Sequence, residues 1–357
     1  SIKRVYDESV ARYKIMYDEV NAMIDDILKR LSATGGLGVV NTIDFDRNEF
    51  VKSGDDWYRA QVGKYSSALL EKIKPEDSEG LSCGKDFIQN DKIKVVFGKD
   101  GVINSLVDLT DGKELCKDYL NKLTVYSDPK SYYNAWDINI DYPKMRKWQF
   151  KLETCRSYVD GVRVVMENIY YFKNSAVIQK VCLNKEDSAV YFDTQVDWRE
   201  THKMLRADFR PTVYSETVNC DIQFGNVDRS TLEDTSVRKA QFEICAHKFV
   251  NVDSDNYGVA LLNDCKYGYR VKDGLISLNL LRSPKSPDPE CDMGDHHFVY
   301  AFYPHNGTWQ ESDVIKKAYC LNNPLIVKEN APAIDSLFDV QGDVIVETIK
   351  VSEDNTG

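Results

Sequence analysis

Most of this sequence is a succession of short apolar segments separated by tight turns, and this feature constrains the fold more than any other. From Phe87 onward, segments rich in β-branched and aromatic residues end at turns that contain Asp and Gly, as at residues 98–101 and 110–112. Such spacing predicts antiparallel hairpins. Because no helical pattern of comparable length follows residue 31, we expect a mainly β protein built on a large antiparallel β-sandwich.

One long α-helix is predicted to precede the strands. From Ile2 to Leu31, apolar residues recur every three or four positions and form one continuous stripe. At about 1.5 Å per residue, this helix would be about 46 Å long. The stripe needs other helices to cover it, and an uncovered stripe would self-associate, so a homo-oligomer is also considered. The glycines of SATGGLG, residues 32–38, end the helix.

The chain is long enough for two or three structural parts. Its 357 residues exceed the usual size of one domain. We assign residues 1–34 to the long helix and residues 35–80 to a small β unit followed by a charged linker. Residues 81–357 are assigned to the large β-sandwich.

Composition argues against several classes of partner. The chain has 46 Lys and Arg against 57 Asp and Glu, and its net charge of -11 argues against nucleic acid or an anionic membrane. No apolar run approaches the roughly 20 residues of a membrane helix, and no signal peptide is recognisable. The nine Cys are odd in number and form no CxxC pair, which favours reduced thiols and a cytoplasmic location.

The most informative stretch runs from Tyr257 to Pro304. Tyr257–Leu262, Leu275–Leu281 and Phe298–Phe302 are predicted strands, with a turn at residues 272–274 between the first two. The connection over residues 282–297 is polar and rich in proline. Such a loop on a β scaffold usually carries a binding surface.

Several segments together resemble one enzyme family. They are GVALLNDCKYGY, LLRSPKSPDPE and GDHHFVYAFYPH in this stretch and, before it, NAWDI at 134–138, DWRETHKMLRADF at 197–209 and FGNVDRST at 224–231. These segments span nearly the whole chain. They resemble the C-terminal β domain of family 38 glycoside hydrolases, the retaining α-mannosidases, in the branch of bacterial and cytosolic or vacuolar enzymes. The sandwich of that family is similar to aldose mutarotases, so a galactose mutarotase-like supersandwich is expected.

The resemblance implies a part of an enzyme that hydrolyses terminal α-linked mannose from oligosaccharides. In the family, SIKRVYDES follows a His-Asp motif whose His binds zinc, and IVETIKVSEDNTG is followed by further strands. Both ends would then be truncated, and residues 1–34 would be a remnant of the helical middle domain. The nucleophile and the zinc ligands would lie outside this chain, in the N-terminal catalytic barrel and at the start of the helical domain. We therefore expect no catalytic residue and no metal ligand here, and a chain that is inactive without that barrel.

Five residues are candidates for substrate binding or for the rim of the active site: Trp136, Asp137, His202, Arg282 and Asp288. Trp136 could stack on the apolar face of a pyranose while Asp137 accepts hydrogen bonds from its hydroxyl groups. The alternative is that Trp136 anchors the core and Asp137 forms a turn. Arg282 resembles, by position, an arginine near the active site of relatives, and Asp288 follows it in the polar loop.

Two further segments with histidines are candidates for acid–base chemistry or metal binding. In DWRETHK, an extended chain would place Trp198, Glu200 and His202 on one face, where the last two could transfer protons or form a solvated strand end. His296 and His297 are adjacent, so on a strand they point to opposite faces and are not expected to share a metal ion.

Two other functions remain open from the sequence. A stand-alone mutarotase-like sugar epimerase would need a histidine and a carboxylate converging in a cleft, and only His202 with Glu200 or His297 with Asp295 would serve. A non-catalytic carbohydrate-binding module would instead present a shallow aromatic groove.

Overall fold

The computed structural model describes residues 2–31, 35–131, 133–332, 334–336, 338–342 and 344–356. The chain forms two compact units, which are Ser1–Asp77 with Asn323–Gly357, and Ser78–Asn322. In the described residues, no helix is both long and apolar enough to cross a membrane.

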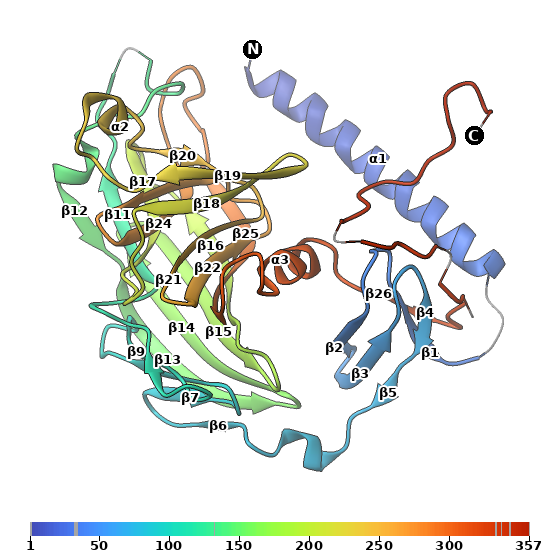
Figure 1. The fold of residues 1–357 in the computed structure, drawn as a ribbon. Helices are drawn as coiled ribbons and strands as arrows, with labels where there is room; N and C mark the ends of the chain where they lie inside the picture. Colours follow the sequence, from blue (N-terminus) through green and yellow to red (C-terminus); the bar gives the residue numbers. More distant parts are fainter. Residues whose placement is uncertain are drawn as a thin grey trace. The chain divides into compact units, whose positions relative to one another are not determined.

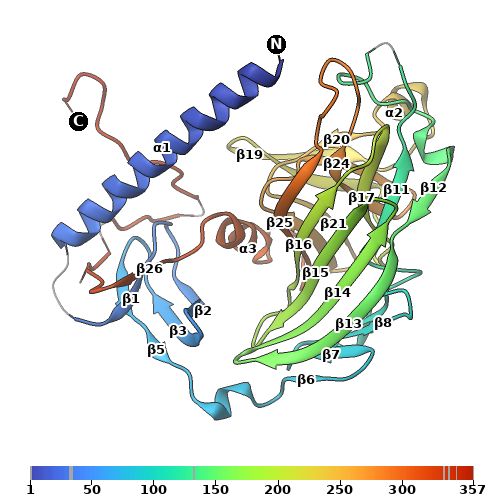
Figure 2. The same ribbon diagram turned by 180° about the vertical axis from the view of Figure 1, so that it is seen from behind.

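The larger unit is a β-sandwich in which every described strand pair is antiparallel (Figure 1). Its nine-stranded sheet has the order β13 (Lys151–Asp160), β14 (Arg163–Phe172), β15 (Ser175–Asn184), β16 (Val190–Trp198), β25 (Gly294–Asn306), β22 (Tyr257–Asn263), β21 (Phe249–Ser254), β18 (Thr217–Ile222) and β19 (Gly225–Ser230). Figure 2 shows the long strands β13 to β16 and β25 of this sheet lying side by side.

Two smaller sheets complete this unit. The six-stranded sheet has the order β12 (Lys147–Gln149), β11 (Lys122–Ser127), β17 (Lys203–Phe209), β24 (Leu275–Arg282), β23 (Gly268–Lys272) and β20 (Ile244–Cys245). The five-stranded sheet has the order β10 (Lys113–Glu114), β9 (Ile103–Asp108), β8 (Ile93–Phe97), β7 (Phe87–Gln89) and β6 (Ser82–Cys83). The short helices are η2 (Tyr142–Lys144), α2 (Ser236–Ala240) and α3 (Val314–Asn322).

One apolar core joins these three sheets. Along β16 every second residue is buried, and this alternation turns Phe192 and Val196 inward while Asp193 and Asp197 face outward. The ring of Phe192 stacks on Tyr300 of β25, with ring centroids 4.9 Å apart, and meets Phe209 of β17 edge-on at 5.8 Å. Burial of this apolar surface is the main force that holds the sandwich together.

The smaller unit combines the long helix with two three-stranded sheets. Helix α1 (Ile2–Leu31) buries Leu28, whereas most of its apolar stripe is exposed. One sheet has the order β26 (Ile326–Glu329), β1 (Leu37–Val40) and β4 (Ser67–Leu69), and the other β2 (Arg47–Ser53), β3 (Asp56–Val62) and β5 (Glu71–Lys72). The short helix η1 (Pro75–Ser78) follows.

The predicted fold class is confirmed: a mainly β chain with a large antiparallel sandwich, one long N-terminal helix and a small β unit. The compact units, however, divide the chain at different residues from the predicted 1–34, 35–80 and 81–357. Asn323–Gly357 groups with the start of the chain because β26 pairs with β1. The helix-ending residues 32–34 lie outside the described residues.

The turn predicted at residues 272–274 and the strand predicted at Phe298–Phe302 are both present, but one preceding strand and the start of the other strand were not predicted. Strand β23 lies between the first two predicted strands, so the turn at Asp273 and Gly274 joins β23 to β24; both residues have positive φ, as a tight hairpin turn requires. Strand β25 begins at Gly294, four residues before the predicted start at Phe298. Its first four residues are mostly polar, but they pair with the end of β16 and so extend the strand. The connecting loop is therefore residues 283–293.

Candidate functional site

Three connections meet at one end of the six-stranded sheet. They are the segment after β11, the turn between β16 and β17 at residues 199–202, and the loop between β24 and β25 at residues 283–293. They meet because β11, β17 and β24 are adjacent antiparallel strands, in which Ser127 pairs with Lys203, and Met204 with Arg282. Figures 1 and 2 both show the loop after β11 beside the loop between β24 and β25.

Backbone hydrogen bonds connect the three segments. Asp128 N–H donates to the carbonyl of His202, and His202 N–H donates to the carbonyl of Ser283, each at 2.9 Å. Ser283 N–H in turn donates to Lys203 O at 3.0 Å. His202 occupies the centre of this chain of bonds with a positive φ of 51°. The three segments therefore form one connected surface.

Arg282 contacts the other segments rather than solvent. Its Nε and Nη2 donate to the two carboxylate oxygens of Asp128 at 2.9 and 3.1 Å, and Nη2 also donates to the carbonyl of Asp137 at 2.5 Å. The Asp128 side chain is only 1% exposed. The backbone N–H of Arg282 donates to Asp292 Oδ2 at 2.9 Å. This arginine therefore ties the loop after β11 to the loop after β24.

Trp136 and Asp137 lie on the exposed outside of this cluster. The backbone N–H groups of both residues donate to the carbonyl of Tyr133 at 2.9 Å, which forms a tight turn. Trp136 is 73% exposed, so it is not a core anchor. An exposed indole on a tied loop can stack on a flat apolar ligand surface. Tyr132, the first residue of this acidic and aromatic segment, lies outside the described residues.

Asp288 has a local role in the structure. Its Oδ1 accepts a hydrogen bond from Glu290 N–H at 2.9 Å, within the same turn. In the described part of the chain, no hydrogen bond or ion pair joins its side chain to Asp137, His202 or Arg282. The structure thus brings Asp137, His202 and Arg282 together and leaves Asp288 on the adjoining loop.

The turn at 199–202 differs from the extended strand that would place Trp198, Glu200 and His202 on one face. Strand β16 ends at Trp198, whose indole N–H donates to the buried Ser283 Oγ. Glu200 is 4% exposed, and its Oε2 lies 3.4 Å from Lys203 Nζ. Within the described residues, His202 Nδ1 and Glu200 Oε1 are buried and have no hydrogen-bond partner.

The protonation of His202 is set mainly by burial. Burial lowers the pKa of His202, Lys130 lowers it further, and Asp128 acts in the opposite direction. A neutral imidazole with an unpaired nitrogen can accept or donate one hydrogen bond, depending on its tautomer. The unpaired Nδ1 is itself buried, so this nitrogen is not open to solvent in the structure.

Neither of the two His–carboxylate pairs that an epimerase would need is joined in the structure. His297 Nε2 lies 2.7 Å from Asp193 Oδ1, not beside Asp295, while Glu200 is paired with Lys203. His296 Nε2 lies 3.0 Å from the carbonyl of Asp292. His296 and His297 therefore contact different partners.

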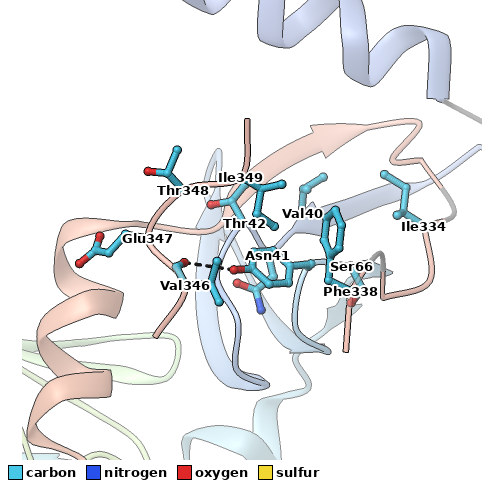
Figure 3. Close-up of a pocket in the computed structure, with 11 residues that line it drawn as sticks. Val40, Asn41, Thr42, Ser66, Ile334, Phe338, Val346, Glu347, Thr348 and Ile349 are labelled. Carbon is cyan, nitrogen blue, oxygen red and sulfur yellow. Dashed lines mark hydrogen bonds between the residues drawn. The ribbon is translucent and has the colours of Figure 1, made fainter. Parts of the chain in front are cut away.

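Two hollows outside the loop cluster offer less chemistry. One, of about 390 Å³, lies on the nine-stranded sheet and includes Asp197, Asp295, His296 and His297. The other, of about 290 Å³, lies in the smaller unit between β1 and the C-terminal tail (Figure 3). There the Tyr65 hydroxyl donates to the carbonyl of Val346 at 3.1 Å, so this contact secures the tail.

The described residues do not fit a metal centre. In residues 2–356, with the gaps given above, no group of three His, Cys, Asp or Glu side chains could hold a metal ion. Zinc in proteins takes three or four such ligands. No step of the chemistry is therefore assigned to a metal bound by these residues.

Sequence reasoning missed two residues that organise the cluster. Asp128 directly follows β11, and Ser283 directly follows β24. Short polar residues at strand ends were a usable signal, but only the pairing of β11, β17 and β24 shows that these ends meet.

Comparison with known proteins identifies relatives of the whole chain. Residues 88–290 match the family described as glycosyl hydrolases family 38 C-terminal domain. The chain is similar to alpha-mannosidase 2C1 of Homo sapiens, with 32% identity over 382 residues that cover 99% of this chain and 36% of the relative. It is also similar to alpha-mannosidase G of Dictyostelium discoideum, with 36% identity over 300 residues that cover 77% of this chain and 27% of the relative. The chain thus spans about a third of the length of these relatives.

A solved structure has a similar fold. The crystal structure of an alpha-mannosidase from Enterococcus faecalis V583 matches 86% of this chain and 42% of its own, with a TM-score of 0.64 and 16% sequence identity. The family match covers more than half of the chain and includes β8 to β24, whose ends carry the loop cluster. The chain therefore belongs to glycosyl hydrolase family 38, and its β-sandwich corresponds to the C-terminal domain of that family.

Proposed function

We propose that this chain is the C-terminal part of a larger retaining α-mannosidase that removes terminal α-linked mannose from oligosaccharides. The observation that supports it best is the family match over residues 88–290, together with similarity to alpha-mannosidases. The role of this part is to wall and support the mannose pocket and to supply rim contacts. Trp136 stacks on the sugar, and Asp137 and His202 bind its hydroxyl groups.

The catalytic groups are proposed to lie in another part of the polypeptide. Retaining hydrolysis needs two carboxyl groups about 5 Å apart, one as nucleophile and one as acid and base. At the loop cluster, Asp128 is paired with Arg282 and Glu200 is buried beside Lys203, so both serve structure. The zinc ion and its ligands are likewise proposed to lie outside this chain, as the family resemblance implies.

The partner and the location follow from the same proposal. The partner is an N-terminal catalytic barrel of the same polypeptide, and α1 is part of a helical middle domain that joins the two. A cytoplasmic location is supported by the cysteine pattern, since the nine cysteines are odd in number and form no CxxC pair.

The proposal is tested by hydrolysis of a chromogenic α-mannoside in the presence of zinc. We expect turnover by the chain joined to its N-terminal barrel and none by the chain alone. Turnover by the chain alone would place a catalytic carboxyl pair within it and contradict the proposal.

Point variants of the joined enzyme then test the rim. Trp136→Ala, Asp137→Ala and His202→Ala are each expected to raise the KM for an oligosaccharide by about tenfold, the effect of losing one stacking or hydrogen-bonding contact. Tyr171→Ala is the matched control, because Tyr171 is half-exposed on β14 of the same sandwich. Sugar binding by the chain alone, with no turnover by the chain alone or by the joined enzyme, would instead favour a carbohydrate-binding module.

A further inference from the structure

We propose that Arg282 and Asp128 form a positioning pair that holds the turn with Trp136 and Asp137 where an extended mannoside passes. The inference rests on the proposed function, since it concerns the same rim. It assigns Arg282 a different role from the sugar contact that the sequence predicts. Arg282 acts through the loop after β11, and neither member of the pair needs to touch the substrate.

The geometry of the pair fixes the direction of the arginine. Two parallel hydrogen bonds, at 2.9 and 3.1 Å, join the planar guanidinium to the Asp128 carboxylate. The Arg282 side chain is 13% exposed and that of Asp128 is 1% exposed, so water competes little for these bonds. Because a bidentate fork allows one relative orientation, the guanidinium is held rigidly over the end of β24.

The same guanidinium then fixes the Trp136 turn. Nη2 donates to the carbonyl of Asp137 at 2.5 Å. The bonds from Trp136 N–H and Asp137 N–H to Tyr133 O are local, so they set the shape of the turn and not its place on the sheet. Trp136 is mostly exposed, so burial does not hold its side chain. The Arg282–Asp137 bond connects this turn to the rigid pair.

The pair also reaches the other two segments. Asp128 N–H donates to His202 O, and Asp292 Oδ2 accepts from Arg282 N–H, each at 2.9 Å. The side-chain pair thus joins the turn with Trp136 and Asp137 to Asp128, and the backbone N–H of Asp128 joins it on to His202. A small displacement of a binding group can reduce catalytic efficiency strongly, so loss of the pair is expected to affect substrate binding beyond the loop itself.

The experiment compares four variants of the enzyme in which this chain is joined to its N-terminal barrel. They are Arg282→Gln, Asp128→Asn, the double variant and the control Arg156→Gln. Arg156 pairs with Glu167 at 2.7 Å on β13 and β14, is 71% exposed, and is not part of the loop cluster. For each we measure kcat and KM with a chromogenic α-mannoside and with an α-linked mannose oligosaccharide, hydrogen exchange of residues 128–141, and the melting temperature.

For Arg282→Gln we expect faster exchange at 128–141 and a fall of about ten- to hundredfold in kcat/KM for the oligosaccharide, mostly through KM. The short chromogenic substrate should be affected less, because it makes fewer rim contacts. The double variant leaves no unpaired buried charge, because it removes both the guanidinium and the carboxylate. Its melting temperature should therefore recover toward the wild-type value, while its KM stays raised. Arg156→Gln should leave all these quantities unchanged.

Three results would overturn the inference. They are an unchanged KM although residues 128–141 exchange faster, unchanged exchange of these residues in Arg282→Gln, and recovery of KM together with the melting temperature in the double variant. If the joined wild-type enzyme hydrolyses no α-mannoside, the proposed function itself is wrong. The exchange of residues 128–141 then still decides whether the pair positions the loop.

Discussion

At the scale of single residues, burial separates polar groups that hold the fold from those that are offered to a ligand. Arg282 and Asp128 are charged and lie at the proposed rim, yet their charges are directed at each other. Trp136 is large and apolar, yet it is exposed. The sequence cannot separate these cases, because residue type does not state what a side chain contacts.

The burial of His202 and His305 predicts how the free energy of unfolding depends on pH. Burial is the main cause that lowers the pKa of both His202 and His305. Between the lowered folded-state pKa and about 6.5, the ordinary value, the unfolded chain binds more protons than the folded one. The free energy of unfolding should therefore fall as the pH falls from about 7.5 to about 5.5.

Urea unfolding at several pH values checks this prediction. His305→Gln should flatten the dependence of the unfolding free energy on pH, because it removes one buried imidazole that titrates. The variant should still fold, since His305 is 6% exposed and its Nε2 lies 2.8 Å from Asn251 Oδ1, a bond that a Gln side chain can replace. A free energy of unfolding that is constant or rises over this interval as the pH falls would contradict the prediction.

At the scale of elements, the outer face of the six-stranded sheet carries polar and charged side chains that are nevertheless buried. Arg206 of β17 is fully buried and bonds to Glu243 and to Ser277. Burial alone would lower the pKa of Arg206, but Glu243 and the other acidic partners hold it above the ordinary value. Glu243 belongs to the segment at residues 231–243, which precedes β20, so this bonding network attaches the segment to the sheet.

Removal of Arg206 should therefore be costly. Arg206→Met leaves Glu243 and Asp208 without their buried cation, and the free energy of unfolding should fall by about 3–5 kcal/mol. The control Arg238→Gln removes an exposed pair with Asp234 in the same segment, and its cost should be below about 1 kcal/mol. Equal losses in chemical denaturation of the two variants would show that the network does not stabilise the sheet.

At the scale of the whole molecule, the two units differ in how completely they bury apolar surface. The sandwich has a continuous core, whereas α1 keeps its stripe exposed, with Tyr13 at 69% and Val20 at 53%. Contiguous apolar surface of this kind promotes association in water.

The isolated chain is accordingly expected to self-associate through α1. Replacing both Tyr13 and Val20 with Lys should shift it toward the monomer in analytical ultracentrifugation, with the melting temperature unchanged, because both side chains face solvent. Leu28→Lys is the contrasting variant, since Leu28 is buried and the change should destabilise the smaller unit. Unaltered self-association of the Tyr13 and Val20 double variant would exclude the stripe as the cause.

Features that depend on local pattern can be predicted from the amino-acid sequence. The period of the apolar residues predicted α1, and alternation with Asp-Gly turns predicted the β-sandwich, because these patterns set which face of an element is apolar. They do not state which elements become neighbours. Only the tertiary structure placed β26 beside β1 and brought the ends of β11, β17 and β24 together. Asp128 meets Arg282 across 154 positions of the sequence because these strands pair, and no local pattern encodes that contact.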